Sequence, residues 1–166
     1  MSQFVRRLNQ IKSNRIPEWL TPSQQEAFFK VKTALRTPST VNLFGRVGVG
    51  KTFLGWTLAH ELNFFYLSDP VLIKTITSNQ YSGLILDNCR ADRQTHRELL
   101  KILQFQNINR AVFISRQMIK DYTQFVELNL TDSDIFTVEQ NLIDAGVLSL
   151  TQDDVPNLWY LVNSSL

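Results

Sequence analysis

Short apolar runs alternate along the chain with longer stretches that have the periodicity of helices. The apolar runs predict five buried strands, at about residues 41–44, 64–67, 81–86, 111–114 and 125–130. The helical stretches cover about residues 23–35, 52–62, 71–78 and 92–105. Strands that alternate with helices favour a parallel sheet between two helical layers. We therefore expect an α/β protein with three layers and a five-stranded, mainly parallel sheet.

Three regions differ in composition. Residues 1–20 form a basic arm, with apolar positions that favour a short amphipathic helix before residue 16. Residues 21–131 form the α/β core, which opens with Thr21 as a helix cap and Pro22 at the first helical position. Residues 132–166 are acidic and predict a helix over 133–145, followed by a β-hairpin. This last region is interpreted as a cap, either a truncated lid or a wing-like element. Its lack of Lys and Arg disfavours a nucleic-acid-binding wing.

The first strand leads into a glycine-rich segment, GRVGVGKT, and then into a helix. The pattern G-x-x-x-x-G-K-[ST] in this context is typical of a P-loop, whose backbone N–H groups surround a phosphate at a helix N-terminus. We expect the ligand to be ATP. The predicted nucleotide-binding residues are Gly45, Arg46, Val47, Gly48, Val49, Gly50, Lys51, Thr52 and Phe53.

The side chains at the end of this loop have separate predicted roles. Lys51 would contact the β- and γ-phosphates, and the hydroxyl of Thr52 would bind Mg²⁺. A second apolar strand, one unit later, delivers Asp87, which fits a Walker B carboxylate. Thr52 and Asp87 are therefore the predicted metal ligands, because Mg²⁺ prefers oxygen.

Composition excludes several classes of protein. The chain has 166 residues, 43% of them hydrophobic, and only one cysteine, Cys89. One cysteine excludes an internal disulfide, and no apolar run reaches the ~20 residues that span a bilayer. The N-terminus lacks the apolar segment of a secretory signal, so we expect a cytoplasmic protein without a membrane partner.

The charge is distributed unevenly. All 17 Lys and Arg lie at or before Lys120 with seven of the 15 acidic residues, so residues 1–120 carry a net +10 and residues 121–166 carry −8. This asymmetry fits an anionic partner, subunits that dock basic face to acidic face, or a basic body that packs its own acidic tail.

With these motifs in order, the segment from about Leu20 to Leu130 resembles the core of the AAA+ and related additional-strand P-loop ATPases. The resemblance depends on GRVGVGKT, GLILDN and AVFIS, and is nearest to small DNA-associated members such as initiators, helicase loaders and transposition regulators. It implies that Ser115 is a sensor-1 residue and that residues 16–20 help enclose the adenine. It also places Arg116 and Lys120 where the family has its trans-acting arginine finger.

Three features depart from that family. Asn88 follows Asp87 where the family has a glutamate, and a neutral amide can position water but cannot accept a proton. No Arg or Lys follows Lys120, so the role of the family's sensor-2 arginine is vacant or filled by a neighbouring subunit. The 36 residues after Leu130 are too few for a full lid. The predicted catalytic set is Lys51, Asp87, Asn88, Ser115 and Arg116, with slow hydrolysis of ATP or binding alone.

Four basic residues recur every three or four positions near the fourth helix: Arg90, Arg93, Arg97 and Lys101. This spacing puts them on one helix face. The face is either solvated or a contact for the phosphates of nucleic acid or for the acidic tail of a neighbouring subunit. The N-terminal arm is a second candidate contact for nucleic acid.

The main functional hypothesis is an ATP-dependent switch or weak ATPase in an oligomeric or nucleic-acid-associated assembly. The alternative is a small-molecule or nucleotide kinase, although such kinases close an arginine-bearing lid late in the chain. A GTPase is disfavoured because the guanine-binding motif Asn-Lys-x-Asp is missing. An interaction subunit with a relic P-loop is disfavoured by the intact Lys51 and Thr52.

Overall fold

The structure is a computed structural model that describes residue 13 and residues 15–76, 81–119 and 124–144. Five strands are present in this part of the chain: β1 (Ser39–Phe44), β2 (Phe65–Leu67), β3 (Leu84–Cys89), β4 (Arg110–Ser115) and β5 (Phe125–Glu127). The helices are η1 (Pro17–Trp19), α2 (Pro22–Ala34), α3 (Lys51–Leu62), η2 (Pro70–Thr75), α4 (Arg93–Phe105) and α5 (Asp132–Asp144), where η denotes a 3₁₀ helix.

The strands form one sheet in the order β2-β3-β4-β1-β5, and every pair is parallel. β4 therefore lies between the P-loop strand β1 and the Walker B strand β3. The register pairs Ser115 with Phe44 on one side and with Cys89 on the other. Because parallel strands end at the same edge of a sheet, the loops after β1, β3 and β4 meet at one place.

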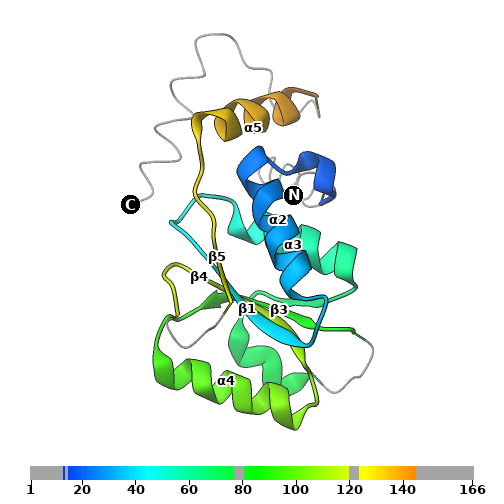
Figure 1. The fold of residues 1–166 in the computed structure, drawn as a ribbon, viewed down its shortest axis with the longest axis vertical. Coiled ribbons are helices and arrows are strands. Elements are labelled where there is room, and N and C mark those ends of the chain that lie inside the picture. The colour runs from blue at the N-terminus through cyan, green and yellow to red at the C-terminus, as the bar shows by residue number, and fades with distance from the viewer. Residues whose placement is uncertain (1–12, 14, 77–80, 120–123, 145–166) are drawn as a thin grey trace, which may run out of the picture.

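Helices cover both faces of the sheet (Figure 1). α2 and α3 lie on one face, and α4 and η2 lie on the other. Alternate residues of β3 and β4 enter the two cores: Ile85 and Val112 pack toward α2 and α3, and Leu86 and Phe113 pack toward α4. Burial on both faces explains why these strands are continuous apolar runs. The predicted three-layer α/β fold with a five-stranded parallel sheet is confirmed.

Several predicted boundaries are wrong. In the described part of the segment predicted as a helix over 71–78, the chain forms the 3₁₀ helix η2, in which Ile73 is the one buried residue. β3 begins at Leu84 rather than at residue 81. Just before it, Gly83 passes so close to Phe64 that a Cβ would lie 2.5 Å from the ring. β5 ends at Glu127 rather than at residue 130. The predicted N-terminal amphipathic helix and C-terminal β-hairpin lie outside the described residues.

The start of α2 is formed as predicted. Thr21 is the cap, Pro22 occupies the first turn, and Gln24 completes a capping box in which side chain and backbone bond reciprocally. Leu20, just before the cap, is fully buried in the core beneath α2 and α3. The end of the region predicted as an arm therefore packs against the core.

One carboxylate joins α5 to α2. Asp134, in the first turn of α5, is fully buried and accepts hydrogen bonds from the backbone N–H and hydroxyl of Ser23 at 2.8 and 2.7 Å. It also accepts from the N–H and hydroxyl of Thr131 at 2.6 and 2.7 Å. Two helix N-termini thus share one negative charge, which suits the positive ends of both dipoles.

Among the described residues, no helix is long and apolar enough to cross a membrane.

Candidate nucleotide-binding site

A cleft of about 730 Å³ opens where the carboxyl ends of β1, β3 and β4 meet. Nine of its lining residues were predicted as site residues: Val47, Gly48, Gly50, Lys51, Thr52, Asp87, Asn88, Ser115 and Arg116. The volume is within the 300–1,000 Å³ typical of small-molecule sites. The strand order therefore brings the two predicted motifs and the sensor-like serine together.

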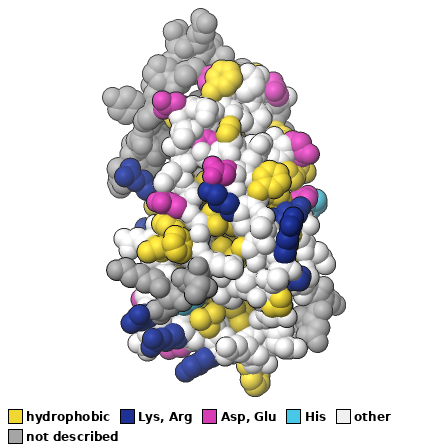
Figure 2. All heavy atoms as spheres, viewed as in Figure 1, with side chains coloured by type: hydrophobic (Ala, Val, Ile, Leu, Met, Phe, Trp, Pro, Cys, Tyr) yellow, Lys and Arg dark blue, Asp and Glu magenta, His cyan; other side chains and the backbone are white. Residues whose placement is uncertain are grey.

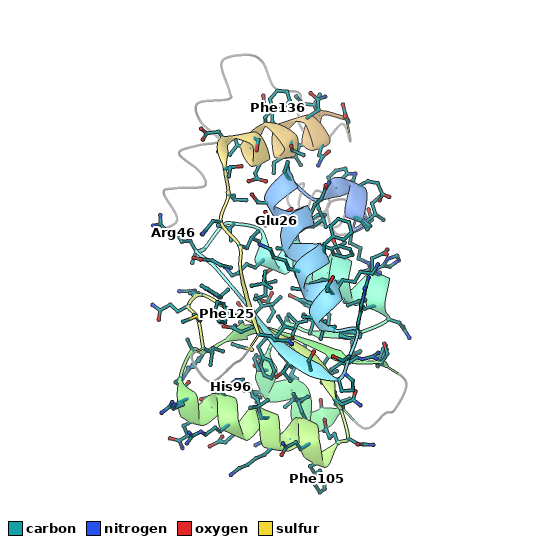
Figure 3. All side chains as sticks on the ribbon, in the orientation of Figure 1. Glu26, Arg46, His96, Phe105, Phe125 and Phe136 are labelled. Carbon is teal, nitrogen blue, oxygen red and sulfur yellow. The ribbon has the colours of Figure 1, made fainter. Side chains whose placement is uncertain are left out.

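The other predicted P-loop residues are not among the residues that line this cleft: Gly45, Arg46, Val49 and Phe53. Val49 is buried in the core, and Phe53 packs against the same core. Arg46 is exposed at the outer side of the loop (Figure 3). A Cβ on Gly45 would lie 2.3 Å from the carbonyl oxygen of Leu128, so only glycine fits there.

The loop curls because two of its residues adopt left-handed backbone conformations. Gly48 has φ +87° and Gly50 has φ +82°, which glycine adopts without strain. α3 starts at Lys51, directly after Gly50. The curled loop thus leads directly into the positive end of α3, and phosphate binding there stays a prediction.

Lys51 lies across the loop. Its Nζ donates hydrogen bonds to the carbonyl oxygens of Gly45 at 2.7 Å and of Arg46 at 2.6 Å. Burial lowers its pKa, the carboxylate of Asp87 opposes that shift, and the charge of Arg116 adds to it. The side chain spans the P-loop, at the position from which it could reach a bound phosphate.

Asp87 is buried and accepts several hydrogen bonds. Its Oδ2 accepts from the hydroxyl of Thr52 at 2.7 Å and from the phenol of Tyr66 at 2.5 Å. Its Oδ1 accepts from the backbone N–H of Asn88 at 2.7 Å. The hydroxyl of Thr52 and the carboxylate of Asp87 are adjacent oxygen donors beside the P-loop. They fit a hard cation such as Mg²⁺, which is usually held by one or two protein oxygens together with phosphates and water.

Burial is the main cause that raises the pKa of the Tyr66 phenol, and its contact with Asp87 raises it further. The phenol therefore stays protonated and remains a donor. Burial likewise raises the pKa of the Cys89 thiol, to about 12, with a smaller contribution from Asp87. This thiol is therefore a poor nucleophile at neutral pH.

Asn88 is exposed and has a left-handed backbone, with φ +56°. Its side-chain amide donates to the carbonyl oxygen of Ser68, just after β2, at 3.0 Å. Asparagine tolerates this backbone conformation better than glutamate does. The local backbone thus gives a physical reason for asparagine beside Asp87.

Ser115 is buried and its hydroxyl is already bonded. It donates to the carbonyl oxygen of Gln117 at 2.6 Å and accepts from the side-chain amide of Asn42 at 2.9 Å. Asn42 lies on β1, is fully buried, and also accepts from the N–H of Ile119 at 2.8 Å. This network fixes the end of β4 and the turn that follows.

Arg116 is exposed and lines the cleft of its own chain. Lys51 lines the same cleft, and the charge of Arg116 lowers the pKa of Lys51. The predicted role as a trans-acting finger is not tested by this geometry and stays a prediction. Lys120, predicted with it, lies outside the described residues.

Sequence reasoning missed three polar residues around the site: Gln24, Asn42 and Tyr66. A signal was present for Asn42, because it interrupts the apolar run of β1. Tyr66 was hidden in the aromatic run FFYL, and Gln24 was hidden in an ordinary helical segment. Their partners lie 21–73 residues away along the chain, beyond the reach of a local pattern.

The predicted basic stripe is on the surface. Arg93, Arg97 and Lys101 are exposed on α4, whereas Arg90 precedes the helix and lines the cleft. Figure 2 shows Lys and Arg side chains gathered at the end of the molecule where α4 lies. The opposite face of α4 turns His96 toward the sheet, where it packs edge-on against Phe113 (Figure 3).

The fold is similar to solved structures of DNA replication initiators. A DnaA structure from Aquifex aeolicus bound to AMPPCP matches with a TM-score of 0.53 and 16% identity, covering 84% of this chain and 57% of that one. DnaA bound to AMPPCP and single-stranded DNA matches with 0.52 and 17%, covering 81% and 55%. A DNA replication initiation factor matches with 0.52 and 12%, covering 80% and 53%.

The chain thus spans just over half the length of these structures. No protein-family model matches the sequence, and a comparison with curated proteins finds no match. At such low identity the likeness shows the fold alone, which is similar to that of part of these initiator structures.

Proposed function

We propose that this chain, which has the fold of an AAA+ core, binds ATP with Mg²⁺ and acts as a nucleotide-dependent switch or a weak ATPase. The observation that carries the proposal is the hydrogen bond from Thr52 to Asp87 beside a P-loop that Lys51 spans. This arrangement joins the Walker A and Walker B motifs across two strands that are not neighbours in the sheet.

In this proposal the backbone of the P-loop and Lys51 bind the phosphates. Thr52 and Asp87 would hold Mg²⁺, which would supply positive charge beside the phosphates. Asn88 and Ser115, on the same cleft, position water, and Arg116 supplies a further positive charge. The fold similarity to DnaA bound to AMPPCP supports this use of the cleft.

We propose slow hydrolysis because the residue after Asp87 is an amide. An amide orients a water molecule by hydrogen bonding but does not take its proton, and general-base catalysis contributes about 10²–10⁴-fold in enzymes that use it. A switch that changes partners between nucleotide states needs only slow turnover.

The switch is proposed to act in an assembly with nucleic acid or with further subunits. Arg93, Arg97 and Lys101 form an exposed basic face on α4, and Phe105 extends from the end of this helix with 93% of its surface exposed (Figure 3). Basic and aromatic side chains together bind the backbone and the bases of single strands. The likeness to DnaA bound to single-stranded DNA supports this part of the proposal.

Titration calorimetry with ATP and MgCl₂ tests the proposal. We expect the wild-type chain to bind ATP and Lys51→Ala to lose binding by at least tenfold, since it removes the one lysine that spans the loop. Lys74→Ala, an exposed lysine on η2, is the control and should bind as the wild type does. Equal binding by Lys51→Ala, or no binding by the wild type, would refute the proposal.

A second experiment tests the switch. Light scattering measures the size of the protein with and without ATP and Mg²⁺, and a binding assay measures its affinity for an oligonucleotide under the same two conditions. We expect ATP to increase self-association or oligonucleotide affinity. A protein that binds ATP without either response would not be a switch of this kind.

A further inference from the structure

Gln24, a buried residue in the first turn of α2, contacts the P-loop without lining the cleft. Its Nε2 donates a hydrogen bond to the carbonyl oxygen of Val49 at 3.3 Å. Its Oε1 accepts from the backbone N–H of Thr21 at 3.1 Å. One amide therefore joins the cap of α2 to the loop, across 25 residues of sequence.

The bond to Val49 determines which way the next N–H points. In a planar trans peptide the carbonyl and the following N–H point in opposite directions. Because the carbonyl of Val49 faces Gln24, the N–H of Gly50 faces away from Gln24, toward the cleft that Gly50 lines. The opposite orientation would aim a carbonyl oxygen at the cleft and would repel a phosphate.

Packing reinforces this orientation. A Cβ added to Gly50 would lie 2.2 Å from Nε2 of Gln24, so the amide occupies the space that any side chain at position 50 would need. Gly50 also has the left-handed backbone that places it at the cap of α3. The amide of Gln24 and the peptide of Gly50 therefore fit each other closely.

Gln24 is itself held in place. The hydroxyl of Thr21 accepts from the N–H of Gln24 at 3.4 Å, which completes the capping box. The neighbouring Ser23 is bonded by both its N–H and its hydroxyl to Asp134 of α5. The capping box with Thr21 and the hydrogen bonds to Asp134 thus fix the first turn of α2, independently of its contact with the P-loop.

We infer that Gln24 is a positioning residue that orients the Val49–Gly50 peptide so that the N–H of Gly50 donates to a bound phosphate. The inference deepens the proposed function and depends on it. It assigns to α2 a role in phosphate binding, although no residue of α2 lines the cleft.

Two substitutions separate this role from the capping of α2. Gln24→Glu keeps the acceptor of the capping box, since glutamate is equally suited to that position, but it replaces the donor that faces Val49. Gln24→Leu removes the donor without adding a charge. Gln25→Glu and Gln25→Leu, at the exposed neighbouring position, are the matched controls.

Calorimetry with tripolyphosphate and with ATP, together with thermal unfolding of each variant, measures the effect. We expect both Gln24 variants to bind either ligand roughly tenfold more weakly, the effect of about one lost hydrogen bond. Both Gln25 variants should match the wild type. Binding is measured at least 15 °C below each melting temperature, so that loss of folded protein does not contribute.

The outcomes distinguish the inference from the function on which it depends. If the wild type binds neither ligand, the proposed function fails. If the wild type binds and a folded Gln24 variant binds equally well, the inference is wrong and the function stands. If only Gln24→Glu weakens binding, the cause is the added charge rather than the peptide orientation, and the inference is again wrong.

Discussion

At the scale of single residues, the polar contacts of the cleft converge on Asp87. Three donors from three elements surround its carboxylate: Thr52 from α3, Tyr66 from β2 and the N–H of Asn88 within β3. A buried charge is stable only when it is paired or hydrogen-bonded. Together these three donors satisfy the carboxylate and fix its position beside the P-loop.

Tyr66→Phe removes one of these donors and keeps the aromatic ring. We expect the free energy of unfolding to fall by about 1.5–3 kcal/mol, the usual contribution of a hydrogen bond to a charged group. Tyr81→Phe, at an exposed position, should leave stability unchanged. Urea denaturation of the three proteins measures the difference, and equal midpoints would show that the contact contributes nothing.

Asn88→Glu introduces a second carboxylate next to Asp87, at a position with a left-handed backbone. We expect it to lower the free energy of unfolding by about 1–2 kcal/mol, because its backbone is left-handed, and to raise ATP turnover if the proposed hydrolysis occurs. Asn63→Glu is the control, since Asn63 has a similar φ of +52° at the end of α3 but does not line the cleft. A phosphate-release assay should show faster turnover for Asn88→Glu alone.

The residues that sequence could identify are those whose chemistry is local. Lys51 and Thr52 were visible because the P-loop is one continuous segment. The pairing of Asn42 with Ser115 was not, because it depends on β4 lying beside β1. The left-handed backbone of Asn88 likewise lies where the register of β3 against β4 shifts, between Leu86 and Cys89. Local sequence patterns therefore identified the residue types of the site but could not predict its long-range contacts.

At the scale of elements, the five strands and the three long helices of the core (α2, α3 and α4) were predictable because their buried faces repeat with a clear period. η2 was predicted as an α-helix because its local pattern is helical, yet it buries only Ile73. Helices are stabilised mainly by packing of an apolar face, and one buried side chain is little support for a longer helix. α5 was also predicted, but its attachment through Asp134 was not.

The attachment of α5 should depend on pH. Burial raises the pKa of Asp134, but hydrogen bonds from Thr21, Ser23 and Thr131 outweigh it, and the net pKa is lowered well below the usual range. An unfolded aspartate titrates near pH 3.9. The stabilisation is therefore complete above about pH 5 and is lost as the pH falls through the lower, folded pKa.

Asp134→Asn tests this dependence. At pH 7 we expect the variant to be less stable by about 2–3 kcal/mol, since an amide presents a donor to groups that are themselves donors. The difference from the wild type should shrink below pH 4. Urea midpoints between pH 7 and pH 3 measure it, with Asp132→Asn at the exposed start of α5 as the control. A constant difference across this range would contradict the assigned pKa.

At the scale of the whole molecule, α4 and α5 lie at opposite ends (Figure 1). α4 carries the basic face, whereas α5 carries acidic residues and no Lys or Arg. The basic residues of α4 and the acidic residues of α5 therefore lie at opposite ends of the molecule, as well as in different parts of the sequence. An anionic partner would approach the α4 end.

Salt dependence tests whether nucleic acid is that partner. Replacing both Arg97 and Lys101 by Gln should reduce the slope of log affinity against log salt by about 1.4 for a single strand, since each phosphate contact contributes about 0.7. The same change at Lys30 and Lys32 of α2 alters net charge equally and should leave the slope unchanged. Fluorescence anisotropy with a labelled oligonucleotide provides the measurement.

The two outermost described strands, β2 and β5, are only three residues long. Edge strands this short offer few unpaired backbone groups to another polypeptide, and natural proteins use short edge strands to resist aggregation. Concentrated solutions of the folded protein should therefore stay clear. Any copies that join one another should do so through side chains, not by extending the sheet across the boundary between molecules.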